Sequence, residues 1–431
     1  MTCRFISVPL MLGLLDRERY GLWLMITSLL TWLGLADLGT PAALQSPLVA
    51  AVVRSDGDEA RRLLSYAWKR LLRSGLLIVA GSLVVVAVFP VAKIVSITRG
   101  HQREFEVALA FSATLYGLGM PLKLGGIVAY ATRRAHIVPW SDIAGQVISL
   151  LLLIALVAFR IPSLVAAIAA TTLVQMIASG ILFFYLVRAA GWMGFKNASG
   201  ATEGEKARIR SRGGAFVLVL IGECLVLQTD NVIIGRVSGP AAIATYAVPA
   251  TFVMQFLLLQ NVVLRPLWTV VAAAKERGDH KRMWHLLLSG VGISTAVGLV
   301  YAGGVAMFGG AAMRLWTHGR IDLPLPMAIG FASYVLVLAP CNFLAIYCNA
   351  ADLVRGRLWG ILSFGIVKVP MSWWWLHHHG VALLPAVFAI AAAATELPVL
   401  TLLALSQLRA FRSQAKVLSE QTGPMKSAVT D

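Results

Sequence analysis

Two short turns in the sequence resemble each other, one in each half of the chain. Residues 55–61 read SDGDEAR and residues 276–282 read ERGDHKR, so Gly-Asp-x-x-Arg occurs at Gly57 and Asp58 and again at Gly278 and Asp279. Each turn follows the second long apolar segment of its half. A Gly-Asp pair is common turn chemistry next to a helix N-cap, but its recurrence at the same place favours an internal duplication.

The segments on either side of these turns are too apolar for a soluble protein. Of the 431 residues, 58% are hydrophobic and 13% are charged, and the mean hydropathy is +0.78. This composition excludes a soluble enzyme, a disordered chain and a disulfide-stapled secreted domain. Helices are expected, because a backbone facing lipid must satisfy its own hydrogen bonds. The apolar segments run approximately over residues 1–14, 21–53, 74–97, 105–131, 137–158, 163–187, 214–235, 241–274, 284–308, 324–349, 358–375 and 381–407.

The charge pattern predicts how these segments cross the membrane. The chain carries a formal net charge of +17, which in so apolar a protein indicates anionic lipid headgroups and not nucleic acid. Lys and Arg residues alternate between the two sets of connecting loops, with 24 on one side and eight on the other. The positive-inside rule therefore predicts that both ends of the chain are cytoplasmic.

We therefore predict an all-α integral membrane protein with twelve transmembrane helices in two six-helix lobes. Because six is an even number, the lobes share one orientation and the repeat is parallel, one of the two repeat designs of transporters. The predicted domains are an N-lobe at 1–190, a cytoplasmic linker at 191–213, a C-lobe at 214–408 and a cytoplasmic tail at 409–431.

The first apolar segment is short for a membrane span. It also contains Arg4 and ends at a charged cluster, residues 16–19. We expect a first helix that lacks its beginning. A signal peptide is the alternative, but no small-residue cleavage site follows the apolar run.

Several motifs along the chain resemble a known family. The sequence is similar to the polysaccharide-transporter branch of the MOP superfamily, the Wzx-like O-antigen and lipopolysaccharide flippases, which are related to the MATE exporters. The resemblance implies a MOP/MATE-like fold and transport by alternating access. The chain departs from the pattern in its short first helix and at Asp16, where a glycine is common. The matching residues are 8–10, 18–23, 36–39, 230–235, 239–246, 265–268, 277–279 and Asn349.

Ionisable residues inside the apolar segments are the sharpest functional signal. Facing lipid, each would cost roughly 3 kcal/mol on insertion scales. We therefore expect them to face a lumen or one another. They are Asp37, Lys123, Glu223, Asp230, Arg265, Lys368 and Glu396.

The three cations are the candidates for substrate binding. Arg265 precedes Pro266, and Lys123 and Lys368 each lie two residues from a proline, which can kink a helix. A guanidinium suits bidentate contact with phosphate, and a cationic lumen would carry a pyrophosphate across the apolar core. Buried ion pairs with the acidic residues are the alternative.

The acidic residues suggest ion coupling and a bend. Glu223 and Asp230 are seven residues apart on one expected helix, so they would share a face and could carry H⁺ or Na⁺. The alternative for Asp230 is a cap or an ion pair within its lobe. Asp37 and Gly39 interrupt the second segment and are expected to form a structural hinge. A structural role in a bend or a turn is also expected for Pro266, Gly57, Asp58, Gly278 and Asp279.

The leading functional hypothesis is a flippase for a polyprenyl-pyrophosphate-linked oligosaccharide in the bacterial cytoplasmic (inner) membrane. A MATE-type exporter of drugs or organic cations is the alternative, because three basic and four acidic intramembrane residues do not decide between them. A polymerase or ligase would need a large outer loop for catalytic residues, and the expected outer loops are short. We therefore expect no enzyme, cofactor or nucleic acid. The three histidines at residues 377–379 are expected to lie at the membrane interface, and a metal site there is the less favoured alternative.

The expected partners follow from this hypothesis. They are the lipid-linked oligosaccharide, membrane lipids, a coupling H⁺ or Na⁺, and other polysaccharide assembly proteins that dock on the basic loops.

Overall fold

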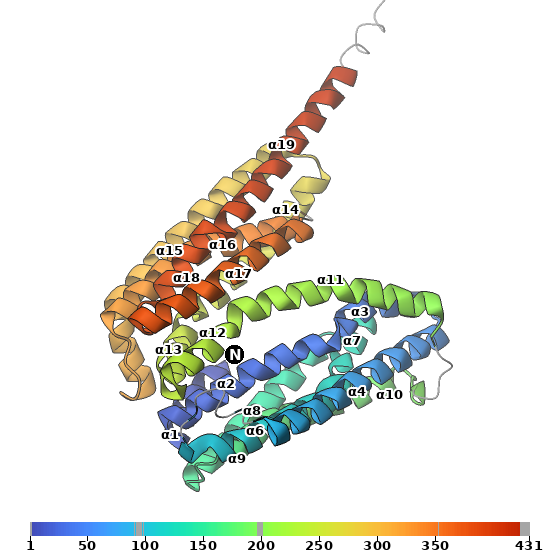
Figure 1. Ribbon diagram of the computed structural model, residues 1–431. Helices are drawn as coiled ribbons and strands as arrows, with labels where there is room; N and C mark the ends of the chain where they lie inside the picture. Colours follow the sequence, from blue (N-terminus) through green and yellow to red (C-terminus); the bar gives the residue numbers. More distant parts are fainter. Residues whose placement is uncertain are drawn as a thin grey trace, which may run out of the picture. The chain divides into compact units, whose positions relative to one another are not determined.

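The computed structural model describes residues 2–89, 91, 97, 99–195, 201–351 and 353–422. Within these ranges the regular structure is entirely helical (Figure 1). A few helical residues, including Arg265 and Pro266, are described in their backbone but not in their side chains. The helices pack into two compact units. Unit 1 comprises Met1–Val248 with Trp316–Arg320, and unit 2 comprises Pro249–Leu315 with Ile321–Asp431.

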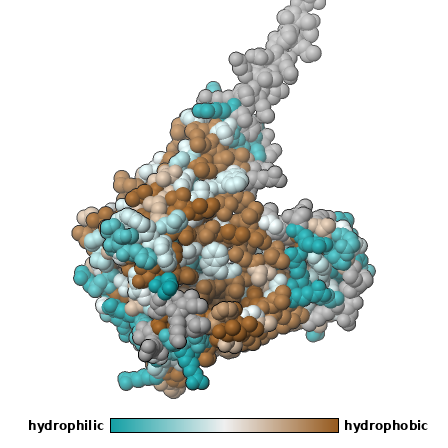
Figure 2. Space-filling model, in the orientation of Figure 1, coloured by the Kyte–Doolittle hydropathy of each residue, from teal (hydrophilic) through white to brown (hydrophobic). Residues whose placement is uncertain are grey.

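Unit 1 contains the helices up to the beginning of α13. These are α1 (Thr2–Leu14), α2 (Arg17–Leu33), α3 (Thr40–Val53), α4 (Gly57–Val88), α6 (Gln102–Gly119), α7 (Leu124–Ala131), α8 (Ile137–Ala158), α9 (Leu164–Ile168), α10 (Val174–Ala189), α11 (Glu203–Leu227), α12 (Thr229–Ser238) and α13 (Pro240–Val253). Figure 2 shows hydrophobic residues over the middle of these helices on the visible face of unit 1, with hydrophilic residues toward their ends.

Unit 2 is built from longer helices. These are α14 (Gln255–Glu276), α15 (His280–Thr317), α16 (Leu325–Ala350), α17 (Val354–His379), α18 (Leu384–Ala394) and α19 (Glu396–Thr422). Its core lies where α14, α15, α16 and α19 meet, around the fully buried Met283, Tyr347, Cys348, Leu400 and Ala404.

The described residues contain eight helices long and apolar enough to cross a membrane, or nine when the bent pair α2 and α3 counts as one span. The predicted number of twelve is not reached in this part of the chain. Apolar residues of α1 cover only Phe5–Leu14, and α12 has ten residues. The helix α17 has the length of a span but carries Lys368 and four tryptophans. Twelve spans and a complete repeat therefore stay predictions.

The compact units do not coincide with the six-and-six division that the linker composition predicts. Helices α11 and α12, which were expected to begin the second lobe, pack against α3 and α2 within unit 1. The lobe boundaries at residues 190 and 214 thus stay a prediction.

Glycines allow the closest helix contacts in unit 1. A Cβ added to Gly75 of α4 would lie 2.1 Å from the carbonyl oxygen of Gly117 in α6. A Cβ added to Gly21 of α2 would lie 1.8 Å from the carbonyl oxygen of Pro240, the first residue of α13. Small residues at such places let two helix backbones approach each other in a membrane protein.

The two similar turns, residues 55–61 and 276–282, have the same geometry, but their equivalent residues differ from those that the Gly-Asp motif suggests. Ser55 (φ 58°) and Gly278 (φ 66°) each adopt the left-handed conformation that ends a helix. The next residue caps the following helix. The Asp56 carboxylate accepts a hydrogen bond from the Glu59 backbone N–H at 2.8 Å. The Asp279 carboxylate accepts one from the backbone N–H three residues later at 2.9 Å.

The equivalent pairs are therefore Ser55-Asp56 and Gly278-Asp279. The expectation that Gly57 and Asp58 match Gly278 and Asp279 is wrong. Gly57 is the first residue of α4, and the Asp58 side chain pairs with Arg61 at 3.2 Å. Only an aspartate directly after the left-handed residue can reach the third backbone N–H of the new helix.

Substitutions of the two left-handed residues should have opposite effects on the free energy of unfolding. Gly278→Ala should lower the free energy of unfolding by about 1 kcal/mol, because an L-residue at this φ is strained. Ser55→Gly should raise it by less than about 1 kcal/mol, because it removes that strain but adds backbone entropy to the unfolded chain. Thermal denaturation in detergent measures both. Equal melting temperatures for the two variants would contradict the assigned conformations.

Candidate functional site

Two helix breaks in unit 1 meet at the predicted hinge. Residues Gly34–Asp37 form a 3₁₀ turn, Leu38 and Gly39 are left-handed, and the axes of α2 and α3 differ by 47°. The Asp37 carboxylate accepts a hydrogen bond from the Gly39 backbone N–H at 2.8 Å. A second 3₁₀ turn, Met120–Lys123, interrupts the segment of α6 and α7. Both breaks place a charged side chain inside an apolar segment.

The charges at the two breaks face each other. The Nζ atom of Lys123 lies 3.7 Å from a carboxylate oxygen of Asp37. It donates a hydrogen bond of 2.8 Å to the Tyr116 hydroxyl and lies 4.7 Å from the centre of that ring. The Asp37 side chain is 12% exposed and the Lys123 side chain 37% exposed. The ion pair considered as an alternative is thus present, yet the ammonium keeps an open side that could contact an anion.

The second candidate cation lies in the interior of unit 2. Lys368 of α17 is 2% exposed. Its Nζ atom lies 4.1 Å from the centre of the Phe388 ring of α18 and 5.9 Å from that of Phe364. A desolvated ammonium over an aromatic face is stabilised by the ring quadrupole. This position favours a role for Lys368 in holding α17 to α18.

The third candidate, Arg265, belongs to α14, whose helix continues through Pro266. Its side chain lies outside the described atoms. One turn earlier, a polar cluster joins α14 to α16. The Asn342 amide donates to the Gln260 side chain at 2.9 Å, and the buried Gln260 amide donates to the Ala339 carbonyl at 2.8 Å. Sequence reasoning missed this cluster because it considered ionisable residues only. Uncharged amides within apolar segments are the signal that could have found it.

Glu223 and Asp230 do not lie on one continuous helix. α11 ends at Leu227 and α12 begins at Thr229, with Gln228 between them, so a spacing of seven does not by itself fix a shared face here, and the shared face stays a prediction. Glu223 is exposed, whereas Asp230 is half-buried. Next to Asp230, the Asn231 amide donates to the Ser28 hydroxyl of α2 at 2.9 Å.

The histidines at the end of α17 bond to their own helix. The Nδ1 atoms of His377 and His378 lie 2.9 Å and 2.7 Å from the carbonyl oxygens of Trp373 and Trp374. Across the described ranges, no group of three or more His, Cys, Asp and Glu residues is placed to hold a metal ion.

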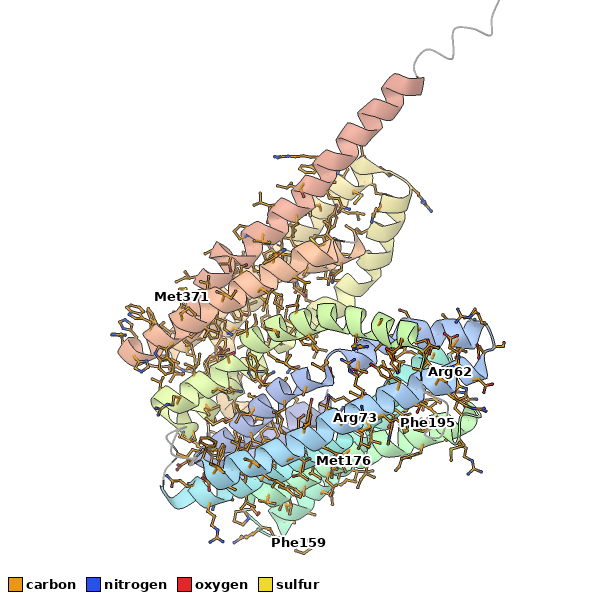
Figure 3. All side chains as sticks on the ribbon, turned by 45° about the vertical axis from the view of Figure 1, so that its right-hand side comes forward. Arg62, Arg73, Phe159, Met176, Phe195 and Met371 are labelled. Carbon is orange, nitrogen blue, oxygen red and sulfur yellow. The ribbon has the colours of Figure 1, made fainter. Side chains whose placement is uncertain are left out.

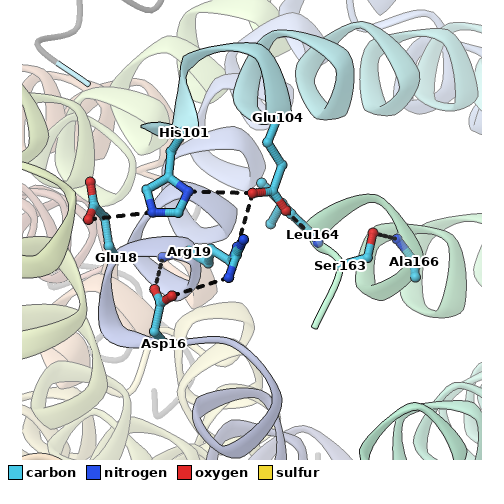
Figure 4. A network of polar contacts seen from close by, with 8 residues as sticks. All are labelled: Asp16, Glu18, Arg19, His101, Glu104, Ser163, Leu164 and Ala166. Atoms are coloured by element: carbon cyan, nitrogen blue, oxygen red, sulfur yellow. Dashed lines mark hydrogen bonds and ion pairs between the residues drawn. The ribbon is translucent and has the colours of Figure 1, made fainter. Parts of the chain in front are cut away.

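A polar network that sequence reasoning did not identify connects three helix ends of unit 1 (Figure 4). The Arg19 guanidinium donates to Glu104 at 3.0 Å and contacts Asp16 at 3.4 Å. The other Glu104 oxygen accepts from the Leu164 backbone N–H at 3.1 Å. His101 lies between Glu18 at 3.7 Å and Glu104 at 3.5 Å. Arg19 and Glu104 are 85 residues apart, which is why the sequence pattern gave no signal for this network.

Comparison with known proteins identifies the fold. No family model matches the chain, and no curated protein sequence matches it. A solved multidrug resistance MATE family transporter of the MOP superfamily, in an inward-facing conformation, is 13% identical with a TM-score of 0.71. That match covers 97% of this chain and 99% of the other. The lipid II flippase MurJ, in an inward closed conformation, is 10% identical with a TM-score of 0.69, covering 92% and 84%.

A MOP superfamily transporter from Pyrococcus furiosus, described as having a binding pocket of reversed polarity, is 11% identical. Its TM-score is 0.62, and the match covers 95% of this chain and 96% of the other. The chain thus shares the fold of these solved proteins, and eight of its described helices are long and apolar enough to cross a membrane. These similar proteins are described as a transporter and a flippase.

Proposed function

We propose that this protein is a flippase that moves a polyprenyl-pyrophosphate-linked oligosaccharide across the bacterial cytoplasmic membrane. The product would feed assembly of a surface polysaccharide such as O-antigen, exopolysaccharide or capsule. The observation that carries the proposal is Lys123, a cation that keeps an open side where two helix breaks meet. It lies in a fold that this chain shares with the lipid II flippase MurJ.

The proposed mechanism makes and breaks no bond. Export is proposed to proceed by alternating access. Lys123 is the proposed contact for the pyrophosphate, Arg265 is a further candidate, and the polyprenyl tail is proposed to stay in the lipid. Lys368 was a third candidate for this contact, and its burial in unit 2 favours a packing role instead. Both chain ends are proposed to be cytoplasmic, in keeping with the Lys and Arg bias of the loops.

A gene deletion in the native host tests the proposal. We expect the complete lipid-linked unit to accumulate in extracts while the surface polymer disappears. Normal glycans together with a new sensitivity to cationic drugs would contradict the proposal and favour a MATE-type exporter. The alternative has its own support, because the MATE structure aligns over nearly the whole chain and Glu223 is exposed on α11.

A pair of variants separates substrate contact by Lys123 from simple neutralisation of Asp37. Lys123→Gln should lower export about tenfold or more, because a charge-assisted hydrogen bond to phosphate is lost. If the lysine only neutralises the carboxylate, the double variant Lys123→Gln/Asp37→Asn would regain export. We expect the double variant to remain defective, with both proteins inserted normally. Restored export would remove Lys123 from the substrate path.

Ion coupling is proposed for Glu223, with Asp230 as the second candidate. An exposed carboxylate on a helix of a transporter can take up and release H⁺ or bind Na⁺. Glu223→Gln should make export independent of the proton or sodium gradient, as measured in vesicles with an imposed gradient. An unchanged dependence would assign Glu223 to structure.

A further inference from the structure

Unit 1 contains a cavity of about 500 Å³ between α4 and the beginning of α11. This volume lies in the range of small-molecule sites, roughly 300–1,000 Å³. None of its residues belongs to the site described above. It is lined by Ser65, Tyr66, Lys69, Arg70, Arg73, Ser74, Leu77, Ala201, Glu203, Lys206 and Arg210.

One face of α4 and one face of α11 form the walls of the cavity. On α4 the lining residues recur at spacings of three and four between Ser65 and Leu77, which places them on one face. On α11, Glu203, Lys206 and Arg210 follow the same spacing. Figure 3 labels Arg62 and Arg73 on α4 and shows that both project from this helix.

The beginning of α11 is fixed against α4. The Thr202 hydroxyl and the Glu205 carboxylate form a reciprocal capping box at the first turn of α11. Glu205 also pairs with Arg62 of α4 at 3.6 Å. This ion pair joins the two cationic faces despite their mutual repulsion.

The cavity has an excess of positive charge. Five of its lining residues are Lys or Arg, and one, Glu203, is acidic. The Glu203 side chain is 80% exposed and pairs with Lys206 at 2.7 Å and Arg210 at 3.9 Å. Its hydrogen bond with Lys206 lowers the pKa of Glu203, so the carboxyl group stays ionised. This one carboxylate leaves most of the positive charge uncompensated.

Several donors in the cavity lack a protein partner. Among the described residues, Lys69 and Arg73 form no hydrogen bond or ion pair. The hydroxyl oxygen of Ser65 is buried and has no hydrogen-bond partner. Arg70 donates to the Tyr66 hydroxyl at 3.3 Å and has further donors to offer. Convergent cationic and hydroxyl donors suit the oxygens of a phosphate group.

The apolar part of α4 next to the cavity points to a lipid. Leu77 lines the cavity and is 73% exposed, and Leu76, Leu83 and Val84 beyond it are also exposed. The cavity itself lies on the side whose loops carry the excess of Lys and Arg, where anionic headgroups are attracted. An amphiphile with a phosphate at one end and a hydrocarbon chain along α4 would match both surfaces.

We propose that this basic pocket binds the phosphate group of a membrane lipid in the leaflet that the Lys- and Arg-rich loops face. Two sources share this chemistry. One is an anionic phospholipid of the bilayer. The other is the diphosphate end of a prenyl-linked substrate on its way into the transporter, and this source rests on the proposed function.

The test uses the purified full-length chain in detergent and measures lipid binding by native mass spectrometry. The probes are dioctanoyl phosphatidylglycerol, dioctanoyl phosphatidylcholine, farnesyl diphosphate and inorganic pyrophosphate. Lys69→Ala/Arg73→Ala removes two exposed cations of the pocket. Arg277→Ala/Lys281→Ala is the matched control, because it removes the same charge from two exposed positions of unit 2, one in the turn after α14 and one at the start of α15. Melting temperatures verify that both variants fold.

We expect the phosphate lipids to bind more tightly than phosphatidylcholine. The pocket variant should lose affinity about tenfold or more, while the control keeps it. Tighter binding of phosphatidylglycerol identifies the bilayer lipid as the source, and tighter binding of farnesyl diphosphate identifies the substrate. Equal losses in both variants, or no preference over phosphatidylcholine, would overturn the proposal. Inorganic pyrophosphate binding as tightly as both lipids would also overturn it, because the apolar wall would contribute nothing.

The proposed function can fail without the pocket failing. Suppose that phosphatidylglycerol binding depends on Lys69 and Arg73 while the deletion strain accumulates no lipid-linked glycan. The lipid-binding proposal would then be supported and the flippase function would be contradicted.

Discussion

Gly21→Val is expected to destabilise unit 1 severely and to abolish transport. A Cβ at this position would lie 1.8 Å from the carbonyl oxygen and 2.6 Å from the carbonyl carbon of Pro240. The obstacle is backbone, so no side-chain rotamer can relieve it, and α2 must move away from the start of α13. Overpacking of a well-packed site costs about 1–3 kcal/mol, and more where the backbone must shift. We therefore expect a loss of at least about 3 kcal/mol.

Gly81→Val is the matched control, because a Cβ at Gly81 of α4 meets no atom within 4 Å. Both variants are purified in detergent, and the fraction that stays monodisperse after heating is compared. The Gly21 variant should precipitate at a clearly lower temperature, whereas the Gly81 variant should behave like the wild type. Wild-type stability of Gly21→Val would show that α2 and α13 do not make this contact.

Lys368→Ala should have the second largest effect, and the effect should be on stability. The side chain is 2% exposed and lies over the Phe388 ring. Truncation leaves a cavity between α17 and α18 and removes a desolvated cation–π contact, a loss on the order of 2–5 kcal/mol. Lys368→Met fills the same space without the charge and should recover the part of this loss that comes from the cavity.

Lys123→Ala serves as the comparison, because the Lys123 side chain is 37% exposed and its truncation leaves no closed cavity. Melting curves of the three variants decide between packing and substrate contact. If Lys368→Ala has the melting temperature of the wild type and loses only export, Lys368 would instead be a substrate-contact residue.

Much of the membrane architecture could be predicted from local patterns. The composition and the apolar segments indicate a multi-pass helical protein, and the MOP-type fold was expected from the motif resemblance. The break at Asp37 and Gly39 was expected because an acidic residue, a glycine and Pro41 interrupt one apolar run. The sequence left two alternatives for Lys123, an ion pair with an acidic residue and contact with substrate. Only the three-dimensional structure places it next to Asp37.

Other features depend on geometry that a linear pattern does not contain. Glu223 and Asp230 were assigned to one helix because a spacing of seven assumes an unbroken turn, and the interruption at Gln228 has no strong sequence signal. The Gly-Asp motif was matched in the wrong register because the residue type in the left-handed position differs, serine at 55 and glycine at 278.

Burial and long-range contact were the hardest to foresee. Nothing in the sequence distinguishes the half-exposed Lys123 from the buried Lys368, since both are lysines near a proline in an apolar segment. The cations of the pocket were counted only as markers of orientation. Their convergence depends on the contact between Arg62 and Glu205, which are far apart in the chain.

The most direct test of the central claim is to measure which leaflet holds the lipid-linked oligosaccharide. Spheroplasts of a host that lacks the downstream polymerase are treated with an external glycosidase that cleaves the glycan unit, and the protected fraction is quantified. With the wild-type protein present, we expect most of the lipid-linked glycan to be cleaved. After depletion of the protein, or with Lys123→Gln, nearly all of it should stay protected. Equal cleavage with and without the protein would contradict the flippase account.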